Sequence, residues 1–215
     1  MNTSTFLKRI HTDYDTQLKY VLLVFVVVVR VLTLQYPLSN PDALHYWEAA
    51  KHIVLGLPYL ELDHQTVRFA IIVPMVIIQA ISTHPYMWYI LPVVLTFSHF
   101  FLLYAIAKRT TSNSGLIITI AAFFLFPYMI FVGSQNMPAG YSIFYLLCGF
   151  LCILKAGDNR QKETRWHVAA GVFHFLAYLT KITNLFLVPA FVLILFLERR
   201  RIKPLLFYGG TLLVL

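Results

Sequence analysis

The side chains best able to do chemistry are gathered in one polar stretch, residues 37–68, of an otherwise apolar chain. Within it Asp42, His45, Glu48 and His52 recur at helical spacing, so a helix would place them on one face. The opposite face would carry Ala43, Trp47, Ala50 and Val54. A carboxylate on such a face can accept a proton from a reacting group. The histidine and glutamate spacings also permit metal binding, but we interpret the face as a water-exposed helix surface and predict no metal or other cofactor.

Local signals predict a helix over residues 41–55. Asn40 is a favourable N-cap, Pro41 suits the first helical position, and Gly56 is a favourable stop. A short amphipathic helix beside a membrane span is expected to lie in the interface with its polar edge towards water. The stretch continues to three further polar candidates, Asp63, His64 and Arg68.

Composition predicts an all-α polytopic membrane protein with one transmembrane domain over residues 1–215. Hydrophobic residues make up 59% of the chain and charged residues 12%, and the mean hydropathy is +0.72. The net charge of +8 does not indicate nucleic-acid binding, because the basic residues cluster at the ends of apolar segments. Cys148 and Cys152 are one helical turn apart and cannot pair within a helix.

Six apolar segments are expected to cross the membrane: 20–36, 86–107, 115–132, 138–154, 166–179 and 184–197. Residues 69–82 form a segment shorter than the ~17–25 residues that a crossing helix needs, so a re-entrant or surface helix is expected there. The apolar run 205–215 is interpreted as a truncated seventh crossing, and the chain as a fragment.

Charge placement sets the expected topology. If 69–82 does not cross, 13 of the 17 lysines and arginines share one side, and Lys51, Arg68 and Lys181 lie on the other. Positively charged loops favour the cytoplasm, so the N-terminus is predicted to be cytoplasmic. The loop 37–85 and the turns 133–138 and 180–184 are then predicted to face outward, with Arg30 inside the first span.

Three groups of residues, in this order along the chain, resemble a known family. They are Arg30, the run 40–50 (NPDALHYWEAA) followed by Arg68, and the helix end 171–183 (GVFHFLAYLTKIT). The pattern resembles the N-terminal half of GT-C-fold glycosyltransferases, which use polyprenyl-phosphate-linked sugars. Protein O-mannosyltransferases and the lipid A aminoarabinose transferase are branches of this superfamily. Many members carry an Asp-Glu pair where this chain has Asp42 and Ala43.

The resemblance implies transfer of a sugar from a polyprenyl-phosphate donor to a lipid, glycan or protein acceptor. The reaction would occur on the outer face of a membrane, and a bacterial inner membrane is expected. Such a transfer needs a carboxylate base and cations that stabilise the departing phosphate. Asp42 is the candidate base, with helix-dipole stabilisation as the alternative role. Lys181 and Arg68 are the candidate phosphate ligands, with snorkelling and lipid-headgroup anchoring as their alternatives.

Seven further residues are candidates for supporting or substrate-binding roles: Arg30, His45, Glu48, Asp63, His64, Gln135 and Asn136. An arginine within a span is a functional candidate by default, while the two amides could bind sugar hydroxyls or cap the helix that begins at Pro138. A transporter and a non-catalytic lipid-phosphate-binding protein are the rival functions. Because the charges gather at span edges instead of the bilayer midplane, an interfacial active site is favoured over a conduction path.

Overall fold

A computed structural model describes residues 3–36, 38–58, 68–158, 160–187, 189–193 and 207–211. Within these residues the chain is helical and has no strand. The α-helices are α1 (Thr3–Leu32), α2 (Pro41–Val54), α3 (Phe69–Ile81), α4 (Ile90–Thr110), α5 (Asn113–Leu125), α6 (Pro127–Ser134), α7 (Pro138–Asp158) and α8 (Glu163–Thr180). Short 3-10 helices are η1 (Pro85–Tyr89), η2 (Arg160–Lys162) and η3 (Ile182–Leu187).

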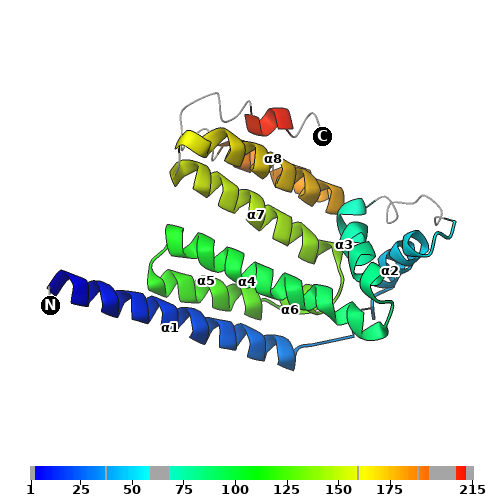
Figure 1. The fold of residues 1–215 in the computed structure, drawn as a ribbon, viewed down its shortest axis with the longest axis horizontal. Helices are drawn as coiled ribbons and strands as arrows, with labels where there is room; N and C mark the ends of the chain where they lie inside the picture. Colours follow the sequence, from blue (N-terminus) through cyan, green and yellow to red (C-terminus); the bar gives the residue numbers. More distant parts are fainter. Residues whose placement is uncertain are drawn as a thin grey trace.

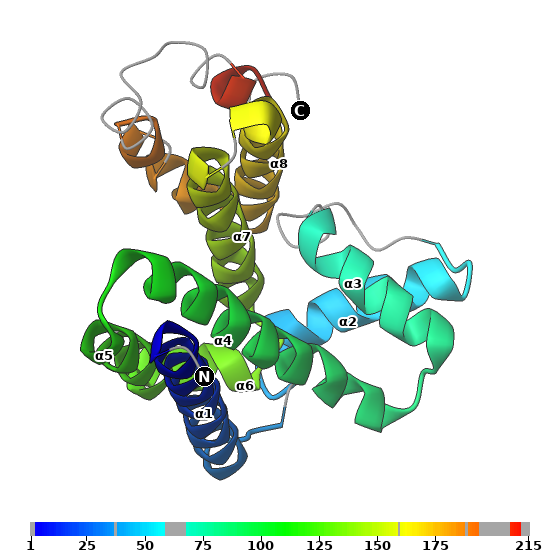
Figure 2. The same ribbon diagram turned by 60° about the vertical axis from the view of Figure 1, so that its left-hand side comes forward.

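The long helices form a bundle with α2 and α3 gathered at one end of it (Figure 1). At that end α1 finishes, α4 and α7 begin, and α8 finishes; we call it the α2–α3 end. At the opposite end lie the last turns of α4 and α7 and the start of α8. Figure 2 shows α2 and α3 side by side, away from α1 and α5.

Among the described residues, two helical segments, Tyr86–Thr110 and Pro138–Asp158, are long and apolar enough to cross a membrane. The pair α5 and α6 makes a third if it is counted as one bent span. These helices confirm the predicted all-α membrane protein. The six crossings inferred from charge stay a prediction. The first residues of the predicted segment 184–197 belong to η3 (Ile182–Leu187). Residues 188 and 194–197 of this segment lie outside the described part.

The helix in the region of the first predicted span, 20–36, has different bounds. Helix α1 begins in the polar N-terminal segment and ends at Leu32. Thr33 closes the helix, and its hydroxyl donates to the Val29 carbonyl at 2.8 Å. Arg30 consequently lies in the last turn of α1, about 3 Å from the helix end at ~1.5 Å per residue.

The predicted span 115–132 is not one continuous helix. Phe126 leaves α5 with extended geometry (φ −63°, ψ 123°), and Pro127 begins α6. Proline restricts the residue before it and supplies no backbone N–H to continue the helix. The axes of α5 and α6 are bent by 63°, so α6 approaches the α2–α3 end in a different direction from α5 (Figure 1).

Helices α2 and α3 pack on each other. Asn40 caps α2 by accepting a hydrogen bond from the Asp42 N–H at 2.9 Å, and Gly56 follows with φ 64°, which suits glycine. The apolar face of α2 is buried in a cluster with α3; its members include Ala43, Tyr46, Trp47, Ile71, Ile72 and Met75. Gln79 of α3 donates to the Trp47 carbonyl at 2.7 Å. The apolar face of α2 is therefore covered largely by protein.

Candidate functional site

The α2–α3 end carries the three principal candidates on three separate elements. Asp42 lies in the first turn of α2, Arg68 immediately precedes α3, and Lys181 immediately follows α8. Helix α3 contacts both α2 and α8, which brings these elements to the same end of the bundle (Figure 1). Asp63 and His64 lie in residues 59–67, outside the described part of the chain.

Arg68 is tied to the helix that carries Asp42. Its Nη1 donates to the Tyr46 hydroxyl at 2.5 Å, and its guanidinium carbon lies 6.0 Å from the centre of the Tyr46 ring. Tyr46 itself is fully buried, so it is a fixed anchor. Because guanidinium has five N–H donors, Arg68 keeps donors for another partner. Tyr46 was not among the candidates predicted from the sequence, since no local pattern distinguishes it from its apolar neighbours.

Lys181 has a fixed backbone and an exposed side chain. Its N–H caps α8 by donating to the carbonyls of Ala177 and Tyr178, both at 3.1 Å. Three residues later Asn184 donates to Ser142 of α7 at 2.6 Å, which holds η3 against the bundle. The Lys181 ammonium forms no hydrogen bond or ion pair with the described residues. It is therefore able to reach an external anion.

The polar face of α2 is partly exposed along its length. Asp42, His45 and Glu48 are all intermediate in exposure. Glu48 pairs with Lys51 one turn away at 3.3 Å, and His52 Nδ1 lies 2.6 Å from the Pro58 carbonyl. No group of three metal-ligating side chains occurs in the described part of the chain.

Gln135 and Asn136 are buried, with 3% and 0% of their surfaces exposed. Gln135 Nε2 donates to the Gln35 side chain at 3.1 Å and to Ser39 at 2.9 Å. Asn136 donates to the Trp88 carbonyl at 3.3 Å. The amides therefore fix the turn between α6 and α7 against neighbouring segments, and a sugar-binding role for them stays a prediction.

Aromatic rings join three segments at the same end. Trp88 of η1 meets Tyr36, which follows α1, edge-on at 5.3 Å between ring centres. It also meets Trp47 of α2 edge-on at 5.7 Å. Such pairs add about 0.5–1.5 kcal/mol beyond the area that they bury. The cluster positions the start of α2, and with it Asp42, relative to α1 and α4.

Arg30 packs against α6 instead of α2. Only 8% of it is exposed, and its Nη1 donates to the Ile130 carbonyl at 3.1 Å. Gly133 makes this approach possible, because a Cβ at that position would overlap the guanidinium. No carboxylate of the described residues pairs with Arg30. The arginine therefore supports the bent segment that leads to Gln135.

Comparison with known protein families places this chain beside a described family. The family model described as dolichyl-phosphate-mannose-protein mannosyltransferase matches residues 75–215. This range includes Lys181, Gln135 and Asn136, and it begins after Asp42 and Arg68. No curated protein and no solved structure matches the chain.

Proposed function

The chain belongs to the dolichyl-phosphate-mannose-protein mannosyltransferase family, and we propose that it transfers a sugar from a polyprenyl-phosphate donor at its α2–α3 end. The family is one of membrane glycosyltransferases that use a lipid-linked sugar. The proposed acceptor is a lipid, glycan or protein hydroxyl. The α2–α3 end would face outward from a bacterial inner membrane, with the N-terminus in the cytoplasm.

The observation that carries this proposal is the convergence of one carboxylate and two cations from distant parts of the chain. Asp42 comes from α2, Arg68 from the start of α3 and Lys181 from the end of α8, all at one end of the bundle. A transfer from a lipid phosphate needs these two kinds of group, a base for the acceptor and cations for the leaving phosphate.

Asp42 is the proposed base. Its carboxylate would take the proton from the acceptor hydroxyl while that oxygen attacks the sugar's anomeric carbon. The bond from that carbon to the phosphate oxygen breaks at the same time, and the electron pair leaves with the lipid phosphate. The hydrogen bond from the Asp42 N–H to Asn40 fixes the first turn of α2. His45 and Glu48, on the same polar face, are proposed to contact the acceptor or donor.

Lys181 and Arg68 are the proposed partners of the leaving phosphate. The Lys181 side chain is exposed and has no protein partner among the described residues. Arg68 uses one donor on Tyr46 and sits at the N-terminus of α3, where the helix dipole also favours an anion. Charge-assisted hydrogen bonds of this kind are about twice as strong as neutral ones. No cofactor is required by this scheme.

The decisive experiment replaces the base. We expect Asp42→Asn, in the full-length gene product reconstituted in lipid vesicles, to lower transfer from labelled polyprenyl-phosphate sugars by ~10²-fold or more. Donor binding should stay close to wild type, because the phosphate ligands are unchanged. Asp158→Asn is the matched control, since it removes a carboxylate at the opposite end of the bundle that pairs with Arg109. Its transfer rate should fall much less.

Full transfer activity in Asp42→Asn would remove Asp42 as the base and direct attention to Glu48 or Asp63. Binding of a lipid-linked sugar without turnover of any donor in the panel would favour a lipid-phosphate-binding protein. If no lipid-linked sugar is bound and none is turned over, the proposed donor class is wrong.

A further inference from the structure

The two cations proposed as phosphate ligands belong to different elements, so their separation depends on how those elements are joined. Arg68 lies at the start of α3 and Lys181 at the end of α8. Helix α7 contacts both α3 and α8, and its first turns lie at the α2–α3 end (Figure 1). Two side chains of α7, Ser142 and Tyr145, form hydrogen bonds to these neighbours. Because they are three residues apart, they share one face of α7.

Tyr145 holds the start of α3. Its hydroxyl donates to the Ala70 carbonyl at 2.9 Å. In a regular helix that carbonyl would accept from the N–H of the residue four positions later, but that residue is Pro74, which has no N–H. Ala70 is 6% exposed, and a buried carbonyl without a hydrogen-bond donor is costly, most of all in a membrane. Tyr145 therefore supplies a hydrogen bond that the α3 backbone cannot make.

Arg68 moves with the turn that Tyr145 holds. The Arg68 carbonyl accepts from the N–H groups of Ile71 and Ile72 at 2.9 and 3.2 Å, so its backbone is part of the first turn of α3, together with Ala70. A displacement of this turn from α7 would consequently displace the Arg68 guanidinium as well.

Ser142 holds Lys181 in an equivalent way. The Asn184 backbone N–H donates to the Lys181 carbonyl at 2.9 Å, and the Asn184 side chain donates to the Ser142 hydroxyl at 2.6 Å. Ser142 is 3% exposed, so this hydrogen bond is shielded from water. Both cations are thus attached to the same face of α7 by short hydrogen-bonded links.

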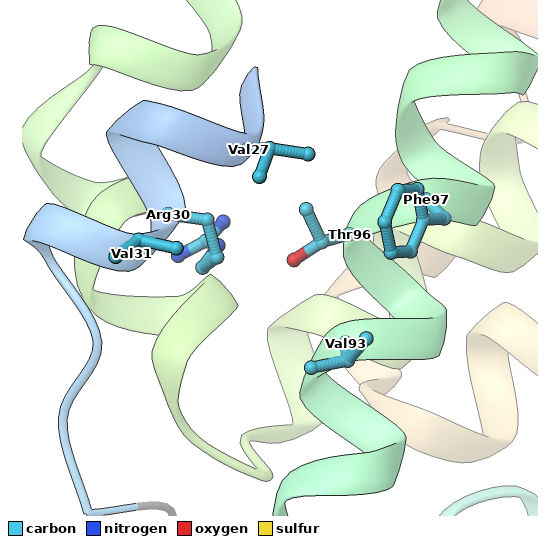
Figure 3. A pocket seen from close by; sticks show the side chains of 6 residues that line it. All are labelled: Val27, Arg30, Val31, Val93, Thr96 and Phe97. Atoms are coloured by element: carbon cyan, nitrogen blue, oxygen red, sulfur yellow. The ribbon is translucent and has the colours of Figure 1, made fainter. Parts of the chain in front are cut away.

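The pocket shown in Figure 3 does not suit an anion. It has a volume of about 200 Å³, lies between α1 and α4, and is lined by Val27, Arg30, Val31, Val93, Thr96 and Phe97. The polar atoms Arg30 Nε and Thr96 Oγ1 are buried, so the surface open to a ligand is apolar. The α2–α3 end therefore stays the place for the phosphate.

We propose that Ser142 and Tyr145 are positioning residues for the phosphate of the sugar donor. From one face of α7 they set the separation of Lys181 and Arg68, so that both cations reach one phosphate group. Neither side chain contacts the phosphate itself. The inference rests on the proposed function, because it takes these two cations as the phosphate ligands.

The first measurement follows the position of α3 without any substrate. Nitroxide labels are placed at position 77 of α3 and position 186 of η3, where Ile77 and Phe186 are 57% and 84% exposed. The full-length gene product is used, with Cys148 and Cys152 replaced by serine. Electron paramagnetic resonance then gives the distribution of distances between the two labels.

Tyr145→Phe removes only a hydroxyl and should broaden the distribution of label distances, because the Ala70 carbonyl loses its partner. Pro74→Ala in the same chain restores an N–H for that carbonyl and should narrow the distribution again. Tyr104→Phe is the matched control, since the Tyr104 hydroxyl donates to a carbonyl of α1 at the opposite end of the bundle. It should leave the distribution unchanged.

The second measurement is the affinity of the same variants, without labels, for a labelled polyprenyl-phosphate sugar in lipid vesicles. Tyr145→Phe should weaken binding by up to about tenfold, and Pro74→Ala in that chain should restore it. Tyr104→Phe should bind like the wild type. Ser142→Ala should weaken binding to a similar degree as Tyr145→Phe, because it releases the segment that follows Lys181.

An unchanged label distribution in Tyr145→Phe would overturn the proposal, as would equal effects in Tyr145→Phe and Tyr104→Phe. Failure of Pro74→Ala to restore the distribution would show that the hydroxyl does not act through the Ala70 carbonyl. A broadened distribution with unchanged donor affinity would reduce Tyr145 to a purely structural residue. Absence of donor binding by the wild type would instead count against the proposed function, while the label distances still decide whether Tyr145 positions α3.

Discussion

The two ends of the bundle treat their cations differently. At the end opposite α2 and α3, Lys108 pairs with Asp15 at 2.7 Å and Arg109 with Asp158 at 2.8 Å, each across a long stretch of sequence. At the α2–α3 end, Arg68 donates to a tyrosine hydroxyl and the Lys181 side chain has no partner in the described part of the chain. Lys108 and Arg109 therefore join helices at one end, while Arg68 and Lys181 at the other keep positive charge available for an anionic ligand.

We expect the two ends of the bundle to lie on opposite sides of the membrane. With Cys148 and Cys152 replaced by serine, cysteines at Ser39 and Thr183 should react with an impermeant thiol reagent added outside intact cells. A cysteine at Thr111 should not react. All three positions are exposed in the structure, so sidedness alone decides the outcome.

Labelling at position 111 from outside would overturn the topology and the outward-facing site together. A cysteine at position 135 sharpens the measurement, because Gln135 is 3% exposed. It should react much more slowly than one at position 39, although both lie at the α2–α3 end.

Removing one lysine from each end tests the difference in available charge. Lys181→Ala should weaken donor binding by about 10- to 100-fold, because a charge-assisted hydrogen bond is worth about 1.5–3 kcal/mol. Lys108→Ala should leave donor binding unchanged, since that ammonium already pairs with Asp15. Equilibrium binding of a labelled polyprenyl-phosphate sugar checks both. Similar losses in the two variants would mean that overall charge, and not the site, governs binding.

Arg30 contacts a backbone carbonyl and Gly133 of α6 instead of a carboxylate. A substitution at Gly133 tests how much this packing contributes to stability. Gly133→Ala places a methyl group where the guanidinium lies and should lower the free energy of unfolding by about 1–3 kcal/mol, as for other overpacked interiors. Gly140→Ala is the control, because its new Cβ would meet neighbours at ordinary distances of 3.5 and 3.7 Å. Thermal unfolding in detergent should show a lower Tm for the first variant only.

The smallest effect on stability is expected at the end opposite α2 and α3. Asp158→Asn breaks the ion pair with Arg109. The Asp158 side chain is 64% exposed and that of Arg109 is 38% exposed, and surface ion pairs of this kind contribute about 0.2–1 kcal/mol to stability. The change in Tm should be slight and should shrink further in high salt. A loss comparable to that of Gly133→Ala would show that the pair does more than join helix ends.

Features that depend on neighbouring residues in the sequence were predictable. Asn40, Pro41 and Gly56 place the helix predicted over 41–55 within one residue of α2 (Pro41–Val54), because caps and turns follow from local hydrogen bonding and backbone geometry. The break at Pro127 was missed although its signal is local. The average hydrophobicity of residues 115–132 is high whether or not a proline is present, but Pro127 still interrupts the helix.

Features that depend on packing between distant segments were not predictable. Arg68 was selected as a cation, but its contact with Tyr46 requires α2 and α3 to be packed together. Arg30 was selected as an arginine within a span, but its contact with α6 arises because the bend at Phe126 brings Gly133 to it. The catalytic roles of Asp42, Arg68 and Lys181 stay predictions, and the experiments above decide them.

The bend between α5 and α6 also limits how much membrane this segment can cross. With 13 and 8 residues, the two helices are about 20 Å and 12 Å long at ~1.5 Å per residue. If α5 follows the membrane normal, a 63° bend lets α6 advance only about 5 Å further, about 25 Å in all against a hydrocarbon core of ~30 Å. The bilayer beside α6 should therefore be locally thin, and a long-chain lipid carrier would find its shortest path to the surface there.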